Sequence, residues 1–305
     1  MKILCIDGGG IRGVFVAAIL RAMEQEYKKP ISDMFDLISG TSTGSIIAAS
    51  SILQIDMSDV LENYIKYGKK IFARQAKIGF LKSVYSDKYL RRYIQKAFGD
   101  ITLNDISKPL IIPAVDITHG KPFVHRSNYG EDLKNDHTIK LWDAVLSSCS
   151  APVYFPPNNI NNNYMAIDGG LWANNPSLVC LTEALSYFKK DTSEINIMSI
   201  GTGIQSINFS VETEKEWGVA KWLPFHLPSM KMTPKLLDLA LQLLSESVTY
   251  HCHHLLGDQY LRINEELGGE IPFDDVEYIE KLIDLGNRAY FNNRTKIHTF
   301  LKSTE

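Results

Sequence analysis

The sequence predicts an α/β fold in which a mostly parallel central sheet is covered by helices on both faces. Short apolar runs alternate along the chain with longer segments in which apolar residues recur at helical spacing. Two of the apolar runs end in glycine-rich turns that lead straight into a helical segment. A hydrophobic content of 45% and a charged content of 22% are ordinary for a globular chain that buries a sizeable core.

In the first third of the chain we expect two strands and four helices. Apolar runs at residues 2–6 and 35–39 predict buried strands. Residues 78–84 mix apolar and basic side chains, and they form either a lid over a site or an ordinary packed loop. Helical patterns cover residues 12–27, 44–53, 57–72 and 86–98.

Strands and helices continue to alternate up to residue 203. Residues 110–116 predict a strong strand with a hairpin partner at 122–126, and the Asn-rich segment 158–163 predicts a turn. Residues 164–167 form a short strand that leads to Asp168. The remaining expected elements are helices at 142–149 and 176–188 and a strand at 195–200.

The composition changes after Gly203. An aromatic, proline-broken stretch at 217–228 either contacts a membrane or seals a core, and we favour the core. It precedes a long helical pattern at 236–256, a strand at 259–263 and a final helix at 276–301. We therefore expect a single domain over residues 1–305, in which 1–203 carry the motifs and 204–305 form a helical C-terminal part.

Charge and cysteine usage exclude several classes of protein. A formal net charge of −3 provides no global attraction to nucleic acid, so we expect no DNA partner. The four cysteines lie far apart without C-x-x-C spacing, which suits a reducing compartment. The N-terminus is typical of a strand rather than a signal peptide, and no apolar stretch approaches the roughly 20 residues that a bilayer span needs. These features predict a soluble cytoplasmic protein.

The first glycine-rich turn carries the pattern G-x-G-x-x-G at Gly8, Gly10 and Gly13. A dinucleotide-binding fold requires an acidic residue at the end of the second strand, whereas Asp33 and Asp36 precede that strand. A phosphate-binding P-loop is excluded because no Gly-Lys-Ser/Thr follows. An oxyanion hole and a structural strand–helix turn remain as interpretations.

The oxyanion-hole interpretation rests on the backbone. The N–H groups of Gly9 and Gly10 would lie near a helix N-terminus, where the helix dipole favours an anion. Glycine allows the chain to approach a substrate closely at such a point. Arg12 either adds positive charge there or holds the loop in place.

The second glycine-rich turn has the G-x-S-x-G form at Gly40, Ser42 and Gly44. In a nucleophile elbow the glycines permit a sharp strand-to-helix turn that exposes the serine hydroxyl. An apolar strand before the turn and an Ala/Ile-rich helix after it fit this interpretation. The alternative is a serine that merely caps the helix.

No histidine is well placed as the base for Ser42. Three of the five late histidines fall inside the helical pattern at 236–256, and the spacing of His251 and His254 lacks the acidic or cysteine partners of a metal site. We therefore expect no metal site. The late histidines are His226, His251, His253, His254 and His298.

Asp168 is a better candidate for the base. It ends an apolar strand and is followed by Gly169 and Gly170. A carboxylate at the mouth of a sheet can accept the Ser42 proton and return it to the leaving group as a general acid. Asp-Gly is also a common turn dipeptide, but its combination with the two glycine-rich motifs favours the catalytic interpretation.

These motifs together resemble the patatin-like phospholipases, which are serine lipid acyl hydrolases with a Ser-Asp dyad. The resemblance rests on Asp7-Gly-Gly-Gly-Ile-Arg-Gly13, Gly40-Thr-Ser-Thr-Gly44 and Asp168-Gly-Gly170, which follow the family's order. Segments 147–157, 174–176 and 199–203 add support. Ser45 departs from the family, in which many members have a third glycine, and we expect it to change packing rather than chemistry.

The resemblance implies a patatin-like fold, with Ser42 as nucleophile, Asp168 as base and the loop from Gly8 to Gly13 as oxyanion hole. It implies that acyl esters of membrane glycerophospholipids are cleaved through an acyl-enzyme, without calcium and without a cofactor. An acyltransferase that uses the same acyl-serine and a catalytically silent lipid-binding protein remain as alternatives.

The chain is also similar in size and opening sequence to bacterial cytoplasmic patatin-like effectors of antiphage defence, which a cyclic oligonucleotide activates. This similarity implies a cyclic-oligonucleotide activator and peripheral contact with the inner face of the membrane, and it is compatible with a homodimer. The basic residues Lys66, Lys69, Lys70 and Arg74 are candidates for contact with an anionic ligand or membrane. The alternative for these four residues is a solvated helix face.

Overall fold

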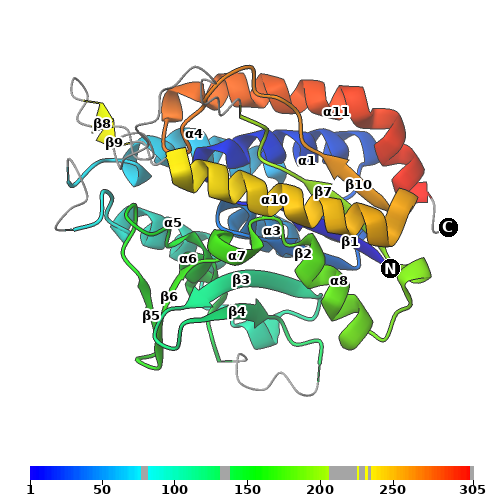
Figure 1. Ribbon diagram of the computed structural model, residues 1–305, viewed down its shortest axis with the longest axis horizontal. Helices are drawn as coiled ribbons and strands as arrows, with labels where there is room; N and C mark the ends of the chain where they lie inside the picture. Colours follow the sequence, from blue (N-terminus) through cyan, green and yellow to red (C-terminus); the bar gives the residue numbers. More distant parts are fainter. Residues whose placement is uncertain (77–81, 131–137, 206–224, 227–230, 233–234, 303–305) are drawn as a thin grey trace, which may run out of the picture.

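A computed structural model of the chain describes residues 1–76, 82–130, 138–205, 225–226, 231–232 and 235–302. In this part of the chain, eight strands form one sheet in the order β10-β7-β1-β2-β3-β6-β5, and β4 also pairs with β3. Helices cover both faces of the sheet (Figure 1). The α/β class predicted from the sequence is therefore confirmed.

One side of the sheet is parallel. Its central strand β1 (Lys2–Ile6) lies between β2 and β7, with Ile6 opposite both Gly40 and Ile200. The β1 residues after Lys2 are buried, as expected for a parallel strand with helices on both of its faces. The other parallel strands are β2 (Leu37–Gly40), β3 (Leu110–Asp116), β7 (Asn196–Ile200) and β10 (Tyr260–Ile263).

The other side of the sheet is antiparallel and consists of β4 (Lys121–Arg126), β5 (Asn158–Ile160) and β6 (Tyr164–Asp168). The prediction of a turn throughout 158–163 was wrong in its first half, because residues 158–160 form β5. Asn158 tolerates this buried position because its side-chain amide donates to the Asp143 carboxylate at 2.7 Å. The turn itself is made by the next residues of the Asn-rich segment, two of which have positive φ.

Strand β3 brings the ends of β2 and β6 together. It has three partners but only two edges, and β4 occupies one edge along residues 111–116. Strands β2 and β6 therefore share the other edge, β2 beside residues 110–111 and β6 beside residues 114–116. Because β2 runs parallel to β3 and β6 runs antiparallel, their C-terminal ends point toward each other across the level of Pro113.

Alternate residues of β1 enter two different cores. Leu4 and Ile6 belong to the larger core, and Ile3 and Cys5 belong to the smaller core on the opposite face of the sheet. The helices of the larger core are α1 (Gly13–Tyr27), α2 (Ile31–Met34), α3 (Thr43–Ile52), α4 (Met57–Ile71), α5 (Lys88–Phe98), α6 (Leu141–Cys149) and α11 (Ile279–Lys302). The smaller core is covered by α8 (Ser177–Ser186) and α10 (Lys235–Leu256), with α7 (Gly170–Ala173) beside α10.

The C-terminal part is not a separate helical layer. It contains the predicted helices α10 and α11, but its strand β10 pairs with β7 and extends the central sheet (Figure 1). Helix α11 packs along α1, which starts directly after the first glycine-rich turn. The last hundred residues therefore contact the elements that carry the N-terminal motif.

Two predicted segments fall largely outside the described residues. Most of the candidate lid at 78–84 does so, and so does the aromatic stretch at 217–228 apart from the short strand β8 (Phe225–His226), which pairs with β9 (Lys231–Met232). Among the described residues, no helix combines the length and apolar character that a bilayer span requires.

Candidate active site

Ser42 stands at the turn between β2 and α3 in an unusual backbone conformation. Its φ of 53° and ψ of −125° lie in a region that L-residues rarely occupy. Its side chain makes no capping hydrogen bond to α3, so the helix-cap interpretation does not describe its role. This strained conformation, with a side chain that does not cap the helix, is what a nucleophile elbow would require.

The two glycines of the elbow are required by close backbone approach. A Cβ atom on Gly40 would lie 2.0 Å from the Gly44 carbonyl oxygen. A Cβ atom on Gly44 would lie 2.5 Å from the carbonyl oxygen of Ile6 on the neighbouring strand. Both distances are far inside van der Waals contact, so any larger residue at either position would displace the turn that presents Ser42.

Serine side chains hold the elbow in place. The Ser42 N–H donates to Ser148 Oγ at 2.9 Å, and that hydroxyl donates to the Pro113 carbonyl at 2.6 Å. Ser45 Oγ donates to the Ser42 carbonyl at 2.6 Å. Ser45, the departure from the family pattern, therefore satisfies a backbone acceptor under the elbow.

Asp168 lies at the end of β6, opposite the elbow. Its side chain is only 7% exposed, and Oδ1 accepts the Gly170 N–H at 2.7 Å. Burial raises the pKa of Asp168 to about 6, although hydrogen bonds from the Ser42 hydroxyl and from Gly170 act in the opposite direction. The fold thus brings the two predicted catalytic residues together through the shared edge of β3, and the neighbouring Gly169 packs against the Pro113 carbonyl.

Two residues of the first glycine loop, Gly9 and Gly10, line a cavity that Ser42 also lines. The Gly8 N–H donates to the Asn174 carbonyl at 3.0 Å, and the Gly13 N–H donates back to carbonyls of the same loop. Among the described residues, the N–H groups of Gly9 and Gly10 have no acceptor, and both residues line the cavity. Of the five residues predicted for the oxyanion hole, these two offer free donors.

The C-terminal part shapes this loop at Gly10. The Ile11 N–H donates to the Phe273 carbonyl at 2.8 Å, and Gly10 has a φ of 58°. A Cβ atom on Gly10 would lie 2.2 Å from the same Phe273 oxygen. Only glycine fits here without strain, because the conformation and the close approach both exclude a side chain.

Arg12 holds the loop rather than reaching into solvent. Its Nε donates to the Gly9 carbonyl at 3.2 Å, and its side chain is buried. Burial lowers the pKa of Arg12, and the nearby Asp238 carboxylate acts in the opposite direction. Arg12 also lines the cavity, so it adds positive charge to the cavity wall.

The cavity is largely apolar. Ser42, Thr43 and Asp168 line it together with residues of the glycine loop, and no histidine is among the described residues that line it. Thr43 is the first residue of α3, where the N–H has no intrahelical acceptor. The apolar walls come from α3, α4, α5, the loop after α6 and α10, and include Ile46, Ile71, Phe72, Leu90, Phe155 and Leu241.

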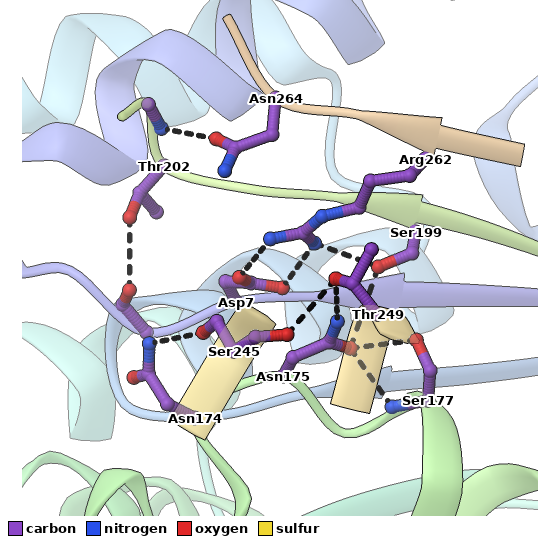
Figure 2. A network of polar contacts seen from close by, with 12 residues as sticks. Asp7, Asn174, Asn175, Ser177, Ser199, Thr202, Ser245, Thr249, Arg262 and Asn264 are labelled. Atoms are coloured by element: carbon purple, nitrogen blue, oxygen red, sulfur yellow. Dashed lines mark hydrogen bonds and ion pairs between the residues drawn. The ribbon is translucent and has the colours of Figure 1, made fainter. Parts of the chain in front are cut away.

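A buried ion pair that the motifs did not predict lies behind the glycine loop (Figure 2). Arg262 on β10 donates to both carboxylate oxygens of Asp7, at 2.8 and 2.6 Å, and also to Ser199 Oγ at 2.7 Å. Burial lowers the pKa of Arg262, but the Asp7 carboxylate outweighs this effect and raises it above its usual value. One feature of the sequence could have indicated this pair, namely Arg262 inside the strand predicted at 259–263. A cation that is buried in a sheet needs an anion beside it.

Further polar contacts join the loop to three later segments (Figure 2). Thr202 Oγ1 donates to the Gly8 carbonyl at 2.9 Å, and Asn174 Nδ2 donates to Ser245 Oγ on α10 at 2.9 Å. Asn175 Oδ1 accepts from both the N–H and the hydroxyl of Ser177. The supporting motifs at 174–176 and 199–203 therefore help to hold the glycine loop in place through polar contacts.

Among the described residues, no group of three or more His, Cys, Asp and Glu side chains is arranged to hold a metal ion. The titratable group that contacts Ser42 is the Asp168 carboxyl. The chemistry that this arrangement supports is therefore nucleophilic attack by a serine, with a carboxylate as base and backbone N–H groups as anion donors.

Comparison with known proteins shows the family of the chain. Residues 4–181 match the family described as patatin-like phospholipase. The chain is 33% identical to a cGAMP-activated phospholipase of Escherichia coli, over 71% of this chain and 67% of that protein, and 27% identical to one of Pseudomonas aeruginosa, over 94% and 87%. It is 26% identical to patatin-like protein 1 of Arabidopsis thaliana, over 96% and 82%. The chain therefore belongs to the patatin-like phospholipase family.

Proposed function

We propose that the protein hydrolyses fatty-acyl esters of membrane glycerophospholipids, with Ser42 as nucleophile and Asp168 as general base. The observation that carries this proposal is the contact between the Ser42 hydroxyl and the buried Asp168 carboxylate in the wall of an apolar cavity. An apolar cavity suits a fatty-acyl chain, because burial of methylene groups stabilises the bound substrate.

In the first half of the reaction, Ser42 Oγ attacks the ester carbonyl while Asp168 accepts its proton. The carbonyl oxygen becomes an anion, which the free N–H groups of Gly9 and Gly10 stabilise together with the Thr43 N–H. Removing one such donor typically costs about 10²–10³ in turnover. Asp168 then donates the proton to the departing alkoxide, which leaves as a lysophospholipid, and the acyl group stays on Ser42.

In the second half, Asp168 accepts a proton from water, and the hydroxide attacks the acyl-serine. The same N–H groups stabilise the second tetrahedral anion, and collapse of this intermediate releases the fatty acid and returns the proton to Ser42. A pKa of about 6 suits both roles, because Asp168 is mostly ionised at neutral pH and can still act as an acid.

Fatty-acid release from mixed phospholipid vesicles tests the proposal directly. We expect release by the wild-type protein, with and without a calcium chelator, and none by Ser42→Ala or Asp168→Asn. A fluorophosphonate probe should label wild type but not Ser42→Ala. Transfer of the acyl group to an added alcohol, in place of release, would show an acyltransferase. Bound lipid without turnover in the wild type would show a lipid-binding protein.

We further propose activation by a cyclic oligonucleotide and action at the inner face of the membrane. The support is the likeness to two bacterial relatives that are named cGAMP-activated phospholipases. Release that requires cGAMP, or another cyclic oligonucleotide, would identify the activator. Equal release with and without a panel of such ligands would contradict the regulatory proposal and leave the hydrolase proposal intact. Light scattering in the presence of the activator would test for a homodimer.

A further inference from the structure

Positive charge is concentrated in one segment of an otherwise acidic chain. Residues 57–98 contain ten Lys and Arg but only three Asp and Glu, whereas the whole chain has 32 basic and 35 acidic residues. The rest of the chain is therefore strongly acidic. The described part of this basic segment consists mainly of α4 and α5, which pack against each other.

Several of these cations face solvent without an ionic partner among the described residues. Lys66 and Lys70 on α4, together with Arg92 and Lys96 on α5, are exposed, and no described acidic group pairs with them. Lys69 differs, because it pairs with Glu277 at 3.4 Å. Four cations that no described acidic group neutralises are therefore candidates for contact with an external anion.

Apolar side chains accompany these cations on the surface. Ile65 on α4 is 54% exposed and Tyr89 on α5 is 43% exposed. Between the helices, the rings of Tyr67 and Tyr93 lie 5.3 Å apart and join the two elements. Basic residues interspersed with aromatic and aliphatic ones are typical of surfaces that bind anionic lipid headgroups and reach into the boundary beneath them.

Other side chains of the same helices line the cavity that contains Ser42. Tyr64 and Ile71 of α4 and Leu90 and Tyr93 of α5 form part of its wall. A helix with its side chains is roughly 10 Å across. A lipid surface that contacts the exposed side chains of these helices would therefore lie within about one helix diameter of the cavity.

We propose that α4 and α5 form the surface through which the protein docks on a bilayer that contains anionic phospholipid. This inference rests on the proposed function, for which it names the docking surface and the lipid class. The α4–α5 face consists of Ile65, Lys66, Lys70, Tyr89, Arg92 and Lys96. Each basic residue near an anionic bilayer strengthens binding by roughly fivefold, an effect that salt screens.

A cyclic oligonucleotide is also an anion, but two observations favour lipid. The cations are distributed over two adjacent helices rather than gathered inside a polar cavity. The exposed Ile65 and Tyr89 side chains gain more from an apolar boundary than from a phosphate. Nucleotide binding is therefore treated as the competing outcome of the test.

The test uses Ser42→Ala protein, so that the vesicles stay intact, and measures flotation with phosphatidylcholine vesicles that do or do not contain phosphatidylglycerol. One variant carries Lys66→Glu, Lys70→Glu and Lys96→Glu. The matched control carries Lys29→Glu, Lys189→Glu and Lys296→Glu, which change the net charge equally at exposed sites outside α4 and α5. Thermal melting of all three proteins checks that each is folded.

We expect binding to the anionic vesicles only, and weaker binding at high salt. The α4–α5 variant should lose about a hundredfold in affinity, whereas the control should stay within about threefold of the parent. Equal losses in both variants, or unchanged binding by the α4–α5 variant, would overturn the proposal. Retained vesicle binding with loss of a cGAMP-induced melting shift would reassign the face to the nucleotide.

A separate assay keeps this result apart from the hydrolase proposal. When the charge changes are made in protein that retains Ser42, both charge variants should cleave a soluble short-chain ester at the wild-type rate. The reason is that the three lysines of the α4–α5 variant do not line the cavity. Ester cleavage without vesicle docking would contradict only the docking surface. Docking by the Ser42→Ala protein, together with no cleavage by the wild type, would contradict only the hydrolase.

Discussion

Arg262 and Asp7 form a bidentate, buried ion pair that joins the last strand of the sheet to the first glycine loop. Asp7 lies two residues before Gly9, and Gly9 and Gly10 line the cavity with N–H groups that have no acceptor among the described residues. The pair therefore links the C-terminal part, which carries no recognisable motif, to the geometry of the candidate oxyanion hole.

Removing the charge of one partner of this ion pair should destabilise the folded protein. Asp7→Asn leaves the Arg262 guanidinium buried without its anion, so we expect a loss of about 3–5 kcal/mol in the free energy of unfolding. Urea denaturation measures this loss. Arg262→Lys retains the charge but not the paired geometry, and it should lie between Asp7→Asn and the wild type in both stability and ester hydrolysis. Wild-type stability in Asp7→Asn would contradict a structural role for the pair.

The activity should depend on pH through Asp168. A general base must be ionised, and burial raises the pKa of Asp168 to about 6. We therefore expect kcat/KM to rise as the pH increases through about 6, to level off above pH 7, and to fall tenfold per pH unit well below 6. A soluble short-chain ester provides the profile without interference from the vesicle surface. A half-maximum near pH 4 would show that the base is an ordinary exposed carboxylate.

Asp168→Asn should abolish activity and stabilise the fold. The pKa of Asp168 is higher in the folded protein than in the unfolded chain, so the folded state favours the protonated carboxyl. Its ionisation therefore costs stability, by up to about 3 kcal/mol above pH 6, and this cost vanishes below about pH 4. A neutral amide escapes the cost. We expect Asp168→Asn to exceed the wild type in urea midpoint at pH 8 and to match it at pH 4.

Backbone strain at Ser42 predicts that two inactive variants differ in their free energy of unfolding. Ser42 adopts a φ of 53° and a ψ of −125°, which cost an L-residue about 1–3 kcal/mol. Ser42→Gly removes this cost in the folded state but adds flexibility to the unfolded chain, so it should be more stable than Ser42→Ala by about 1 kcal/mol. Denaturant unfolding of both variants makes the comparison, and each serves as the activity control for the other. Greater stability of Ser42→Ala would contradict the strain.

The sequence by itself determined the local structural motifs of this protein. Short apolar runs followed by glycines predict compact strand-to-helix turns, and Ser42 in the pattern G-x-S-x-G predicts an elbow because of the backbone angles that the pattern permits. Alternation of strands and helices determined the α/β class for a similar reason, since parallel strands need helical crossovers. These features depend on residues that are near one another in the chain.

Only the tertiary structure decided which of these motifs lie next to one another in space. Ser42 and Asp168 come together because β2 and β6 share one edge of β3, and no local pattern specifies such long-range pairing. The same holds for Arg262, whose partner Asp7 lies at the other end of the chain. It also holds for Gly8, whose N–H donates to the distant Asn174 carbonyl, whereas the N–H groups of Gly9 and Gly10 have no acceptor among the described residues. Local sequence preferences predict the turn in which a residue lies. Which distant residue lies beside it in space is determined by the packing of the whole sheet.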